Sequence, residues 1–379
     1  MKDGDLPIYL DHNATTPLLA EVVDAMLPYL RKHFGNPSSG HVYGRQARDA
    51  VEAARAQVAS LIGATSAEIV FTSGGTEANN LAIRGTAASR PDRKHIVTSV
   101  IEHPATTNPC RLLEQHGWEV TWLGVDQAGR VYVDDVQHAV NERTALVTLM
   151  HANNETGTLQ PVAEVAPAVH EAGALLHTDA AQSVGKVALR VDQLGVDLLS
   201  IAGHKLYAPK GVGALYVRDG VTLEPMLRGA GHERGLRPGT ENVASIVGLG
   251  VACEVAAASL AEESVRVRAL RDKLWSLLQA QIPDLALNGH ETQRLPNTLN
   301  VRFPGGLGSA VLAGAPGVAA STGSACHEGG ESASAVLLAM GVTADEALGS
   351  VRLSLGRETT DEDVQRAAQM LVRAWKRLG

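Results

Sequence analysis

A glycine turn between an apolar run and a helical stretch is the first place where this chain has residues suited to chemistry. The run 69–72 is followed by Ser73, Gly74, Gly75 and Thr76, and the helical stretch begins there. The first N–H groups of a helix have no partner inside it, and they bind anions such as phosphate. The spacing therefore predicts a phosphate site, with a plain glycine turn capped by Thr76 as the alternative.

Three further apolar runs end in polar residues of chemical interest. Asn154 follows one run, Asp179 the next and Lys205 the third. A lysine placed behind a buried strand has a lowered pKa and becomes a nucleophile for carbonyl groups. Pyridoxal 5′-phosphate needs a lysine for its Schiff base, a carboxylate for its pyridinium nitrogen and a cup for its phosphate. Taken together, the strand ends predict a site for this cofactor.

The elements that must position these residues alternate between strand-like and helix-like segments. Seven short runs have the composition of buried strands, and stretches such as 104–116 and 161–172 between them have that of helices. This alternation is typical of a mostly parallel sheet covered on both faces, whose ligands bind at the carboxyl ends of the strands. The predicted strands are 69–72, 95–99, 120–123, 146–150, 175–178, 198–201 and 214–217.

The pattern changes after about residue 254, which predicts a second domain. The later segments are a long helix over 256–282, a strand over 298–303, a glycine-rich connection over 305–317, a strand over 351–355 and a last amphipathic helix over 362–378. We predict a large cofactor-binding domain over 16–255. Residues 1–15 and 256–379 are expected to form a smaller α+β domain.

Composition excludes several classes of protein. The chain has 379 residues, of which 45% are hydrophobic and 20% charged, with a net charge of −8. These values are typical of globular proteins and exclude a disordered or collagen-like chain. The sequence has no basic stripe of the kind that would indicate nucleic-acid binding. The longest uncharged apolar stretch, 243–253, is shorter than the roughly 20 residues of a membrane span, and the polar residues 1–5 do not resemble a signal peptide.

Cysteine usage leads to the same expected compartment. The three cysteines are Cys110, Cys253 and Cys326, without Cys-x-x-Cys spacing. An odd number of isolated cysteines favours reduced thiols in the cytoplasm. No cluster has the spacing of a metal site, so no metal is expected. Cys110 and Cys253 lie in apolar or helical segments, which favours a role as small buried side chains.

The chain resembles the cysteine desulfurases of the NifS/IscS type, a branch of the class V aminotransferases with the fold type I architecture. The motifs that carry the resemblance are 9–17, 73–77, 203–205, 322–326 and 350–357, so it spans nearly the whole chain. It implies a large domain with a mostly parallel, mixed seven-stranded sheet between helices, plus a smaller α+β domain. It also implies pyridoxal 5′-phosphate as the cofactor.

The resemblance assigns roles around the cofactor. Lys205 is expected to hold it and later to move the substrate α-proton, and Asp179 to pair with its pyridinium nitrogen. Gln182 and Asn154 are expected on its phenolic oxygen side. His103 is expected to stack on its ring and to take part in catalysis.

The phosphate contacts have a further implication for assembly. Gly75, Thr76 and His204 are expected to bind the phosphate within one chain. Thr240 is expected to reach the phosphate from the other subunit. The resemblance therefore implies a homodimer with its active site at the subunit interface.

The substrate side depends on three residues. Arg352 is expected to clamp the carboxylate of an amino acid, because a guanidinium binds a carboxylate through two parallel hydrogen bonds. Asn13 is expected to line the same pocket. Cys326 is expected to attack the sulfur of L-cysteine as a thiolate, leaving L-alanine and a persulfide for transfer to a sulfur-acceptor protein.

Some positions depart from the desulfurase pattern. Ala202 stands where the family often has a serine that binds phosphate, a hydroxyl contact worth about 1 kcal/mol. Ala230, Pro238 and the His327 that follows Cys326 also differ.

These departures, with the segments 237–242 and 292–298, are similar to selenocysteine lyases, which release selenide and alanine from L-selenocysteine. That activity is the first alternative. An aminotransferase or a plain C–S lyase is a second, although neither needs Cys326. A non-catalytic sulfur-transfer scaffold is a third, although such a scaffold is expected to have lost Lys205 or Asp179.

Overall fold

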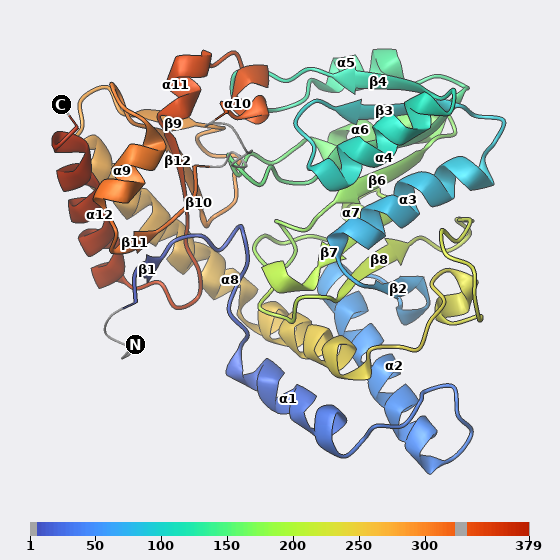
Figure 1. The fold of residues 1–379 in the computed structure, drawn as a ribbon. Coiled ribbons are helices and arrows are strands. Elements are labelled where there is room, and N and C mark those ends of the chain that lie inside the picture. Colours follow the sequence, from blue (N-terminus) through green and yellow to red (C-terminus); the bar gives the residue numbers. More distant parts are fainter. Residues whose placement is uncertain (1–5, 323–331, 379) are drawn as a thin grey trace.

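The computed structural model describes residues 6–322 and 332–378, and its main feature is a seven-stranded sheet (Figure 1). The strands are β2 (Ile69–Thr72), β3 (His95–Ser99), β4 (Glu119–Leu123), β5 (Thr144–Met150), β6 (Leu175–Asp179), β7 (Leu198–Ala202) and β8 (Gly213–Val217). Their order across the sheet is β2-β8-β7-β6-β5-β3-β4. All seven lie where the sequence predicts strands, and the mixed, mostly parallel sheet is confirmed.

Only β8 runs against the other strands of this sheet. It pairs antiparallel with both β2 and β7, whereas the remaining neighbours pair in parallel. The carboxyl ends of β2, β5, β6 and β7 therefore meet at one edge. This is the edge where the sequence places its candidate site residues.

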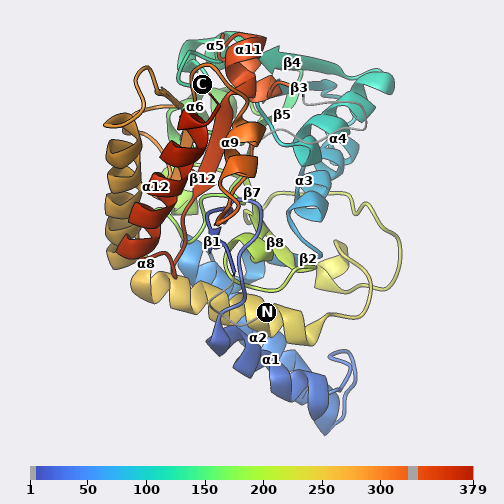
Figure 2. The ribbon, with the colours of Figure 1, turned by 60° about the vertical axis from the view of Figure 1, so that its left-hand side comes forward.

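Alternate residues of the strands supply two separate cores. Leu146 and Leu198 face one core, and their neighbours Val147 and Leu199 face the other. Because strand side chains alternate between faces, runs that are apolar at every position indicate a sheet buried on both sides. The sheet is covered accordingly by helices on each face (Figures 1 and 2).

Two helices pack on one face and several on the other. α3 (Gly75–Ser89) and α4 (Pro104–Gln115) supply Leu81 and Cys110 to the first core. The second core receives side chains from α1 (Ala20–Arg31), α2 (Val42–Ile62), α5 (Val133–Ala139), α6 (Val162–Glu171), α7 (Val191–Leu194) and α8 (Val243–Gln279).

The remaining elements form a smaller α+β part with its own core. Its three-stranded sheet has the order β12-β10-β9, and both pairings are antiparallel. α12 packs on α8 and α9 beside this sheet (Figure 2). The elements are β1 (Ile8–Tyr9), β9 (Ala286–Asn288), β10 (Thr298–Arg302), α9 (Gly308–Gly314), β11 (Val318–Ala319), α10 (Ala335–Ala339), α11 (Ala344–Leu348), β12 (Ser350–Ser354) and α12 (Asp361–Lys376).

One long helix joins the two parts. α8 begins at Val243, earlier than the predicted start at 256, and it continues unbroken to Gln279. Leu249 and Cys253 lie in the core of the large sheet, whereas Leu270 and Leu274 lie in the core of the small one. The predicted division at 255–256 therefore falls inside a helix, and the domain boundaries stay a prediction.

The same helix is long and apolar enough for a membrane span, and half of its most apolar 18-residue stretch is buried inside the protein. It packs along α1 and α2, as a core helix does.

A second difference from the sequence prediction concerns the glycine-rich connection 305–317. It contains the short helix α9, whose Val311 packs in the small core.

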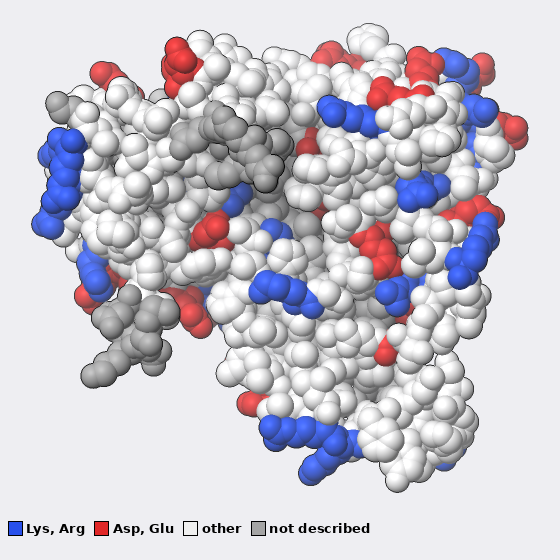
Figure 3. All heavy atoms as spheres, viewed as in Figure 1, with Lys and Arg blue, Asp and Glu red and all other residues white. Residues whose placement is uncertain are grey.

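The face seen in Figure 3 carries charges of both signs. Lys and Arg side chains and Asp and Glu side chains are scattered over both parts, and no large area of one sign is visible on it.

Candidate active site

A cavity of about 320 Å³ lies at the carboxyl ends of the central strands, where the two parts of the molecule meet. Ten of the predicted site residues line it: Asn13, Gly75, Thr76, His103, Asn154, Asp179, Gln182, His204, Lys205 and Arg352. They come from loops, strands and helix ends that are far apart in the sequence. The topology therefore brings together nearly the whole set that the sequence singled out.

Lys205 closes a single 3₁₀ turn, Gly203–Lys205, directly after β7. Its ammonium group donates hydrogen bonds to the carbonyl oxygens of Asn13 and, at 2.7 Å, of Ala14. Burial, and next the nearby guanidinium of Arg352, lower the pKa of Lys205 to about 8. About a tenth of Lys205 is thus a neutral amine at pH 7, far more than for an ordinary lysine, and a nucleophile or a base needs this neutral form.

Asp179 ends β6 and is held as a hydrogen-bond acceptor. Its Oδ2 accepts from Asn79 Nδ2 at 2.6 Å, and its Oδ1 accepts from the backbone N–H of Ala181 at 3.0 Å. Asn79 Nδ2 also lies 3.3 Å from the hydroxyl of Thr106. These two donors fix the orientation of the carboxylate that would pair with a pyridinium nitrogen.

Asn79 was not singled out from the sequence, although a signal was present. It lies one helical turn after Gly75 and Thr76, so the start of α3 and this amide share a face. Asn79 is fully buried between Ala78 and Leu81, which are core residues. A polar residue inside an otherwise apolar helical face needs a partner, and here the partner is Asp179.

The turn before α3 is shaped by close backbone approaches. Gly74 precedes the helix with φ of 146°, a conformation that residues with a side chain rarely adopt. A Cβ on Gly213 would lie 2.7 Å from the Cα of Gly74, so β8 also needs a glycine where it passes this turn. A Cβ on Gly75 would lie 3.2 Å from the Cβ of Ala202. The first turn of α3 therefore opens its N–H groups to the cavity beside Ala202.

Two histidines of the site are held neutral. His103 caps α4, and its Nδ1 accepts a hydrogen bond from the N–H of Ala105 at 3.1 Å, so its proton is on Nε2. Burial and then Lys205 lower the pKa of His204 to about 4. The Nδ1 of His204 lies 3.2 Å from the hydroxyl of Thr15.

Glu102, directly before His103, fixes the ends of two strands from a fully buried position. Its carboxyl group accepts from the hydroxyl of Ser99 at 2.5 Å and from the N–H of Met150 at 2.9 Å. Burial raises the pKa of Glu102 to about 8.

Arg352 extends from β12 toward the cavity. One terminal nitrogen pairs with Oδ1 of Asp11 at 2.8 Å, and the other donates to the carbonyl oxygen of Asn154 at 3.1 Å. The Nε atom of Arg352 is buried and has no partner among the described residues. Asn13, beside it, donates through Nδ2 to the hydroxyl of Thr298 at 2.9 Å. The guanidinium is thus oriented from behind while it faces the cavity.

The residues present fit pyridoxal 5′-phosphate. The cavity volume lies at the lower end of the range for small-ligand sites. It offers open N–H groups at the start of α3, a hydrogen-bonded carboxylate on Asp179, a neutral imidazole on His103 and an amine of lowered pKa on Lys205. Among the residues described, no group of three or more His, Cys, Asp or Glu side chains is arranged to hold a metal ion.

Two predicted site residues lie elsewhere. Thr240 is exposed and does not line the cavity of its own chain, so its contact across a subunit interface stays a prediction. Cys326 lies outside the described residues. Cys110 and Cys253 are buried, and burial raises the pKa of each thiol to about 12, which confirms them as small core side chains.

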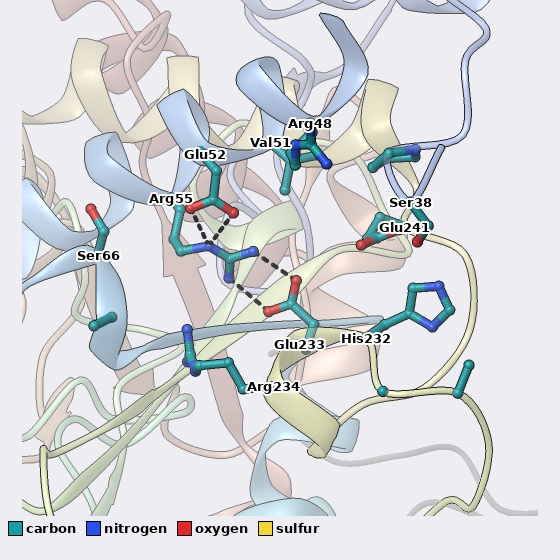
Figure 4. A pocket seen from close by; sticks show the side chains of 14 residues that line it. Ser38, Arg48, Val51, Glu52, Arg55, Ser66, His232, Glu233, Arg234 and Glu241 are labelled. Atoms are coloured by element: carbon teal, nitrogen blue, oxygen red, sulfur yellow. Dashed lines mark hydrogen bonds and ion pairs between the residues drawn. The ribbon is translucent and has the colours of Figure 1, made fainter. Parts of the chain in front are cut away.

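A larger hollow, of about 680 Å³, lies between α2 and the segment 230–241 (Figure 4). Its central groups neutralise each other, because Arg55 pairs with both carboxylate oxygens of Glu233, at 2.7 and 2.8 Å. Glu52 also faces this guanidinium. No lysine lines this hollow, so it does not offer the chemistry of the smaller cavity.

Comparison with known proteins agrees with this geometry. A family model described as aminotransferase class-V matches residues 8–367. The chain belongs to this family. It is 48% identical over 373 residues to the cysteine desulfurase of Trichormus azollae, a match that covers 98% of this chain and 93% of that protein. It is 47% identical to the cysteine desulfurase IscS of Methanosarcina thermophila, with 96% and 92% covered.

Solved structures of class-V relatives share the fold. A NifS-like protein superposes with a TM-score of 0.91 at 37% identity, covering 97% of this chain and 99% of that one. A structure described as SspA in complex with cysteine gives a TM-score of 0.82 at 37% identity, with 92% and 98% covered. The sequence-based assignment to the desulfurase branch of class V is thus confirmed, together with the fold type I architecture.

Proposed function

We propose that this protein is a pyridoxal 5′-phosphate-dependent cysteine desulfurase. It converts L-cysteine to L-alanine and passes the sulfur through Cys326 to an acceptor protein, acting as a homodimer. The observation that carries the proposal is the meeting of Lys205, Asp179 and Arg352 around one cavity. The desulfurase names of the relatives favour cysteine over selenocysteine as the substrate. The cytoplasmic location stays a prediction.

The chain's own residues bind both the cofactor and the substrate. The start of α3 and His204 would hold the phosphate, Asp179 the ring nitrogen, His103 the ring face and Lys205 the reactive carbonyl carbon. Pyridoxal 5′-phosphate, when bound, supplies a ring that stabilises negative charge at the substrate Cα. Arg352 would bind the substrate carboxylate, with Asp11 fixing the plane of its guanidinium.

Lys205 is the group that would move the α-proton. Its lowered pKa of about 8 leaves a neutral amine available to accept a proton, and the same amine can return it to the carbon skeleton. The carbonyl oxygens of Asn13 and Ala14 would hold the resulting ammonium group.

The sulfur step balances without an external oxidant. The Cys326 thiolate attacks the sulfur of the substrate, a sulfur–sulfur bond forms and the substrate Cβ–S bond breaks. The electron pair of the broken bond stays with the carbon skeleton, and a proton completes alanine. The enzyme is left with a persulfide, whose outer sulfur passes to the acceptor.

The test measures alanine and sulfide from L-cysteine in the presence of a thiol reductant. Wild type should give both in equal amounts, and Lys205→Ala neither. Lys210→Ala, which changes an exposed lysine five residues away, is the matched control and should behave as wild type. Pyruvate and ammonia in place of alanine would contradict the proposal, as would full turnover by Lys205→Ala.

A further inference from the structure

A second lysine lies behind the cavity and is not used in the mechanism above. Lys186 is partly buried in the turns between β6 and α7, four residues after Gln182. Its Nζ donates a hydrogen bond to Gln182 Oε1 at 3.2 Å. Within residues 6–322 and 332–378, no carboxylate lies within 4.0 Å of this ammonium group. Burying a lysine in this way without an ion-pair partner costs free energy of folding. The contact of Lys186 with the amide of Gln182 therefore needs an explanation.

The contact determines which way the Gln182 amide points. Gln182 Nε2 donates to the carbonyl oxygen of Asn13 at 3.0 Å, on the side away from Lys186. An ammonium group has only donors and a backbone carbonyl only acceptor sites. A flipped amide would place its NH₂ against the ammonium group of Lys186 and its oxygen against the Asn13 carbonyl. The two neighbours therefore allow one orientation.

The fixed amide reaches the cofactor side of the site. Gln182 lines the cavity, and one of its two N–H groups is used by Asn13. The same Asn13 carbonyl accepts from Lys205, so the orientation of Gln182 and the resting position of Lys205 are set by one acceptor. The second N–H of Gln182 is left to donate into the cavity.

We propose that Lys186 is a positioning residue, which fixes the Gln182 amide so that a donor, and not an acceptor, faces the bound cofactor. This inference rests on the proposed function, because it needs a cofactor in the cavity. It assigns to Lys186 an effect on the bound ring that is transmitted through Gln182 and not by direct contact.

The surroundings of Lys186 support this role. Burial, with the charges of Lys205 and Arg352 next, lowers the pKa of Lys186 to about 7. The side chain is an ammonium group below that pH, and the neutral amine above it still has N–H groups to donate to Gln182 Oε1. Beside it, away from the active-site cavity, lies a small cavity of about 50 Å³, also lined by Tyr207, Asn297 and Arg357. That space gives a longer side chain at position 186 some room.

The test compares Lys186→Met, which removes the donor, with Lys186→Arg, which keeps one. Both are loaded with pyridoxal 5′-phosphate. The readouts are the pH midpoint of the visible absorption of the bound cofactor and the cofactor dissociation constant. Lys273→Met, which removes a lysine from the far part of α8, is the control for loss of one charge.

Without the oriented donor, the phenolic oxygen of the bound cofactor keeps more negative charge. That charge favours retention of the proton beside it, whose loss sets the pH midpoint of the absorption. We expect Lys186→Met to move the midpoint to higher pH by about half a unit to one unit. We expect it to weaken cofactor binding about five- to tenfold. Lys186→Arg should restore both values, and Lys273→Met should match wild type.

A cycle with Gln182→Leu separates positioning from a direct charge effect. If Lys186 acts through the amide, Lys186→Met should change neither readout further once Gln182 is leucine. An equal shift in that background would overturn the inference, as would a Lys186→Met protein with wild-type midpoint and affinity. If Lys186→Met does not fold, Lys186→Gln replaces it, since a glutamine leaves the Gln182 orientation unspecified.

Failure of the inference and of the proposed function give different results. A wild-type protein that takes up no cofactor would overturn both. A wild type that binds cofactor and turns over cysteine, with Lys186→Met unchanged, would overturn only the role of Lys186.

Discussion

Replacement of Asn79 by Asp tests how the floor of the active site is held. The change alters one atom, from an NH₂ donor to an oxygen, at a position 2.6 Å from Asp179 Oδ2. It leaves no cavity, so packing is nearly unchanged. Two carboxylates at this distance cannot both be ionised, and the pair must take up one proton. The new O–H···O⁻ bond then replaces the lost N–H···O⁻ bond at similar strength.

The penalty is therefore the free energy of protonating a carboxyl group at the working pH. For an aspartate with an unfolded-state pKa near 3.9, this is about 4 kcal/mol at pH 7, or about 1.4 kcal/mol per pH unit. The folded variant binds one more proton than its unfolded chain between about pH 4 and 7. Its stability relative to wild type should thus rise as the pH falls, and the difference should nearly vanish at pH 4.

The assay is urea unfolding of the cofactor-free protein at several pH values. Asn80→Asp is the matched control, because Asn80 lies on the outer side of the same helix and, within the part of the chain that the structure describes, donates only to the carbonyl of Thr76. It should change stability by less than about 0.5 kcal/mol, with little pH dependence. An Asn79→Asp protein as stable as wild type at pH 7, or with a deficit that does not depend on pH, would refute the arrangement described for Asp179.

Three further predictions concern neighbouring features. Burial lowers the pKa of His151 to about 4. Between pH 6.5 and 4 the free energy of unfolding of the wild type should therefore fall relative to that of His151→Leu, by up to about 1.4 kcal/mol per pH unit. An equal pH dependence of this free energy in the two proteins would contradict the prediction. Arg55→Met leaves the buried Glu233 carboxylate unpaired and should lower the free energy of unfolding by about 3–5 kcal/mol, with Glu233→Leu in the same chain recovering much of the loss. Ala202→Ser adds a hydroxyl beside the start of α3 and should tighten cofactor binding about fivefold. An unchanged dissociation constant in equilibrium dialysis would contradict the placement of the phosphate beside residue 202.

Much of the fold was predictable because its signals are local. The seven strands of the large sheet are short runs rich in apolar and β-branched residues, and they lie where they were expected. The strand-end rule then placed Asp179 and Lys205 at one edge. Arg352 and Asn13 belong to the smaller part of the molecule, and their approach to this edge was implied only by the family resemblance.

Other features depend on tertiary contacts that leave little trace in the sequence. α8 was expected to begin only at 256, because its apolar face changes from one core to the other near that point, although no residue between Val243 and Gln279 interrupts it. Lys186 and Asn79 were missed because each acts through another side chain, Gln182 or Asp179. A pattern search identifies residues that resemble reacting groups, whereas hydrogen bonds between distant segments become visible only in the folded chain.

The central claim is that sulfur leaves cysteine as a persulfide on Cys326. The direct measurement is the mass of the holoprotein after addition of L-cysteine without reductant, with peptide mapping and quantitation of alanine. We expect one extra sulfur atom on the peptide that contains Cys326, with alanine formed in equal amount, and neither in Cys326→Ala. Alanine formed by Cys326→Ala at the wild-type rate, or a sulfur-free Cys326 peptide after turnover, would contradict it. If Cys326→Ala released selenide from selenocysteine while it failed on cysteine, Cys326 would still be required for sulfur.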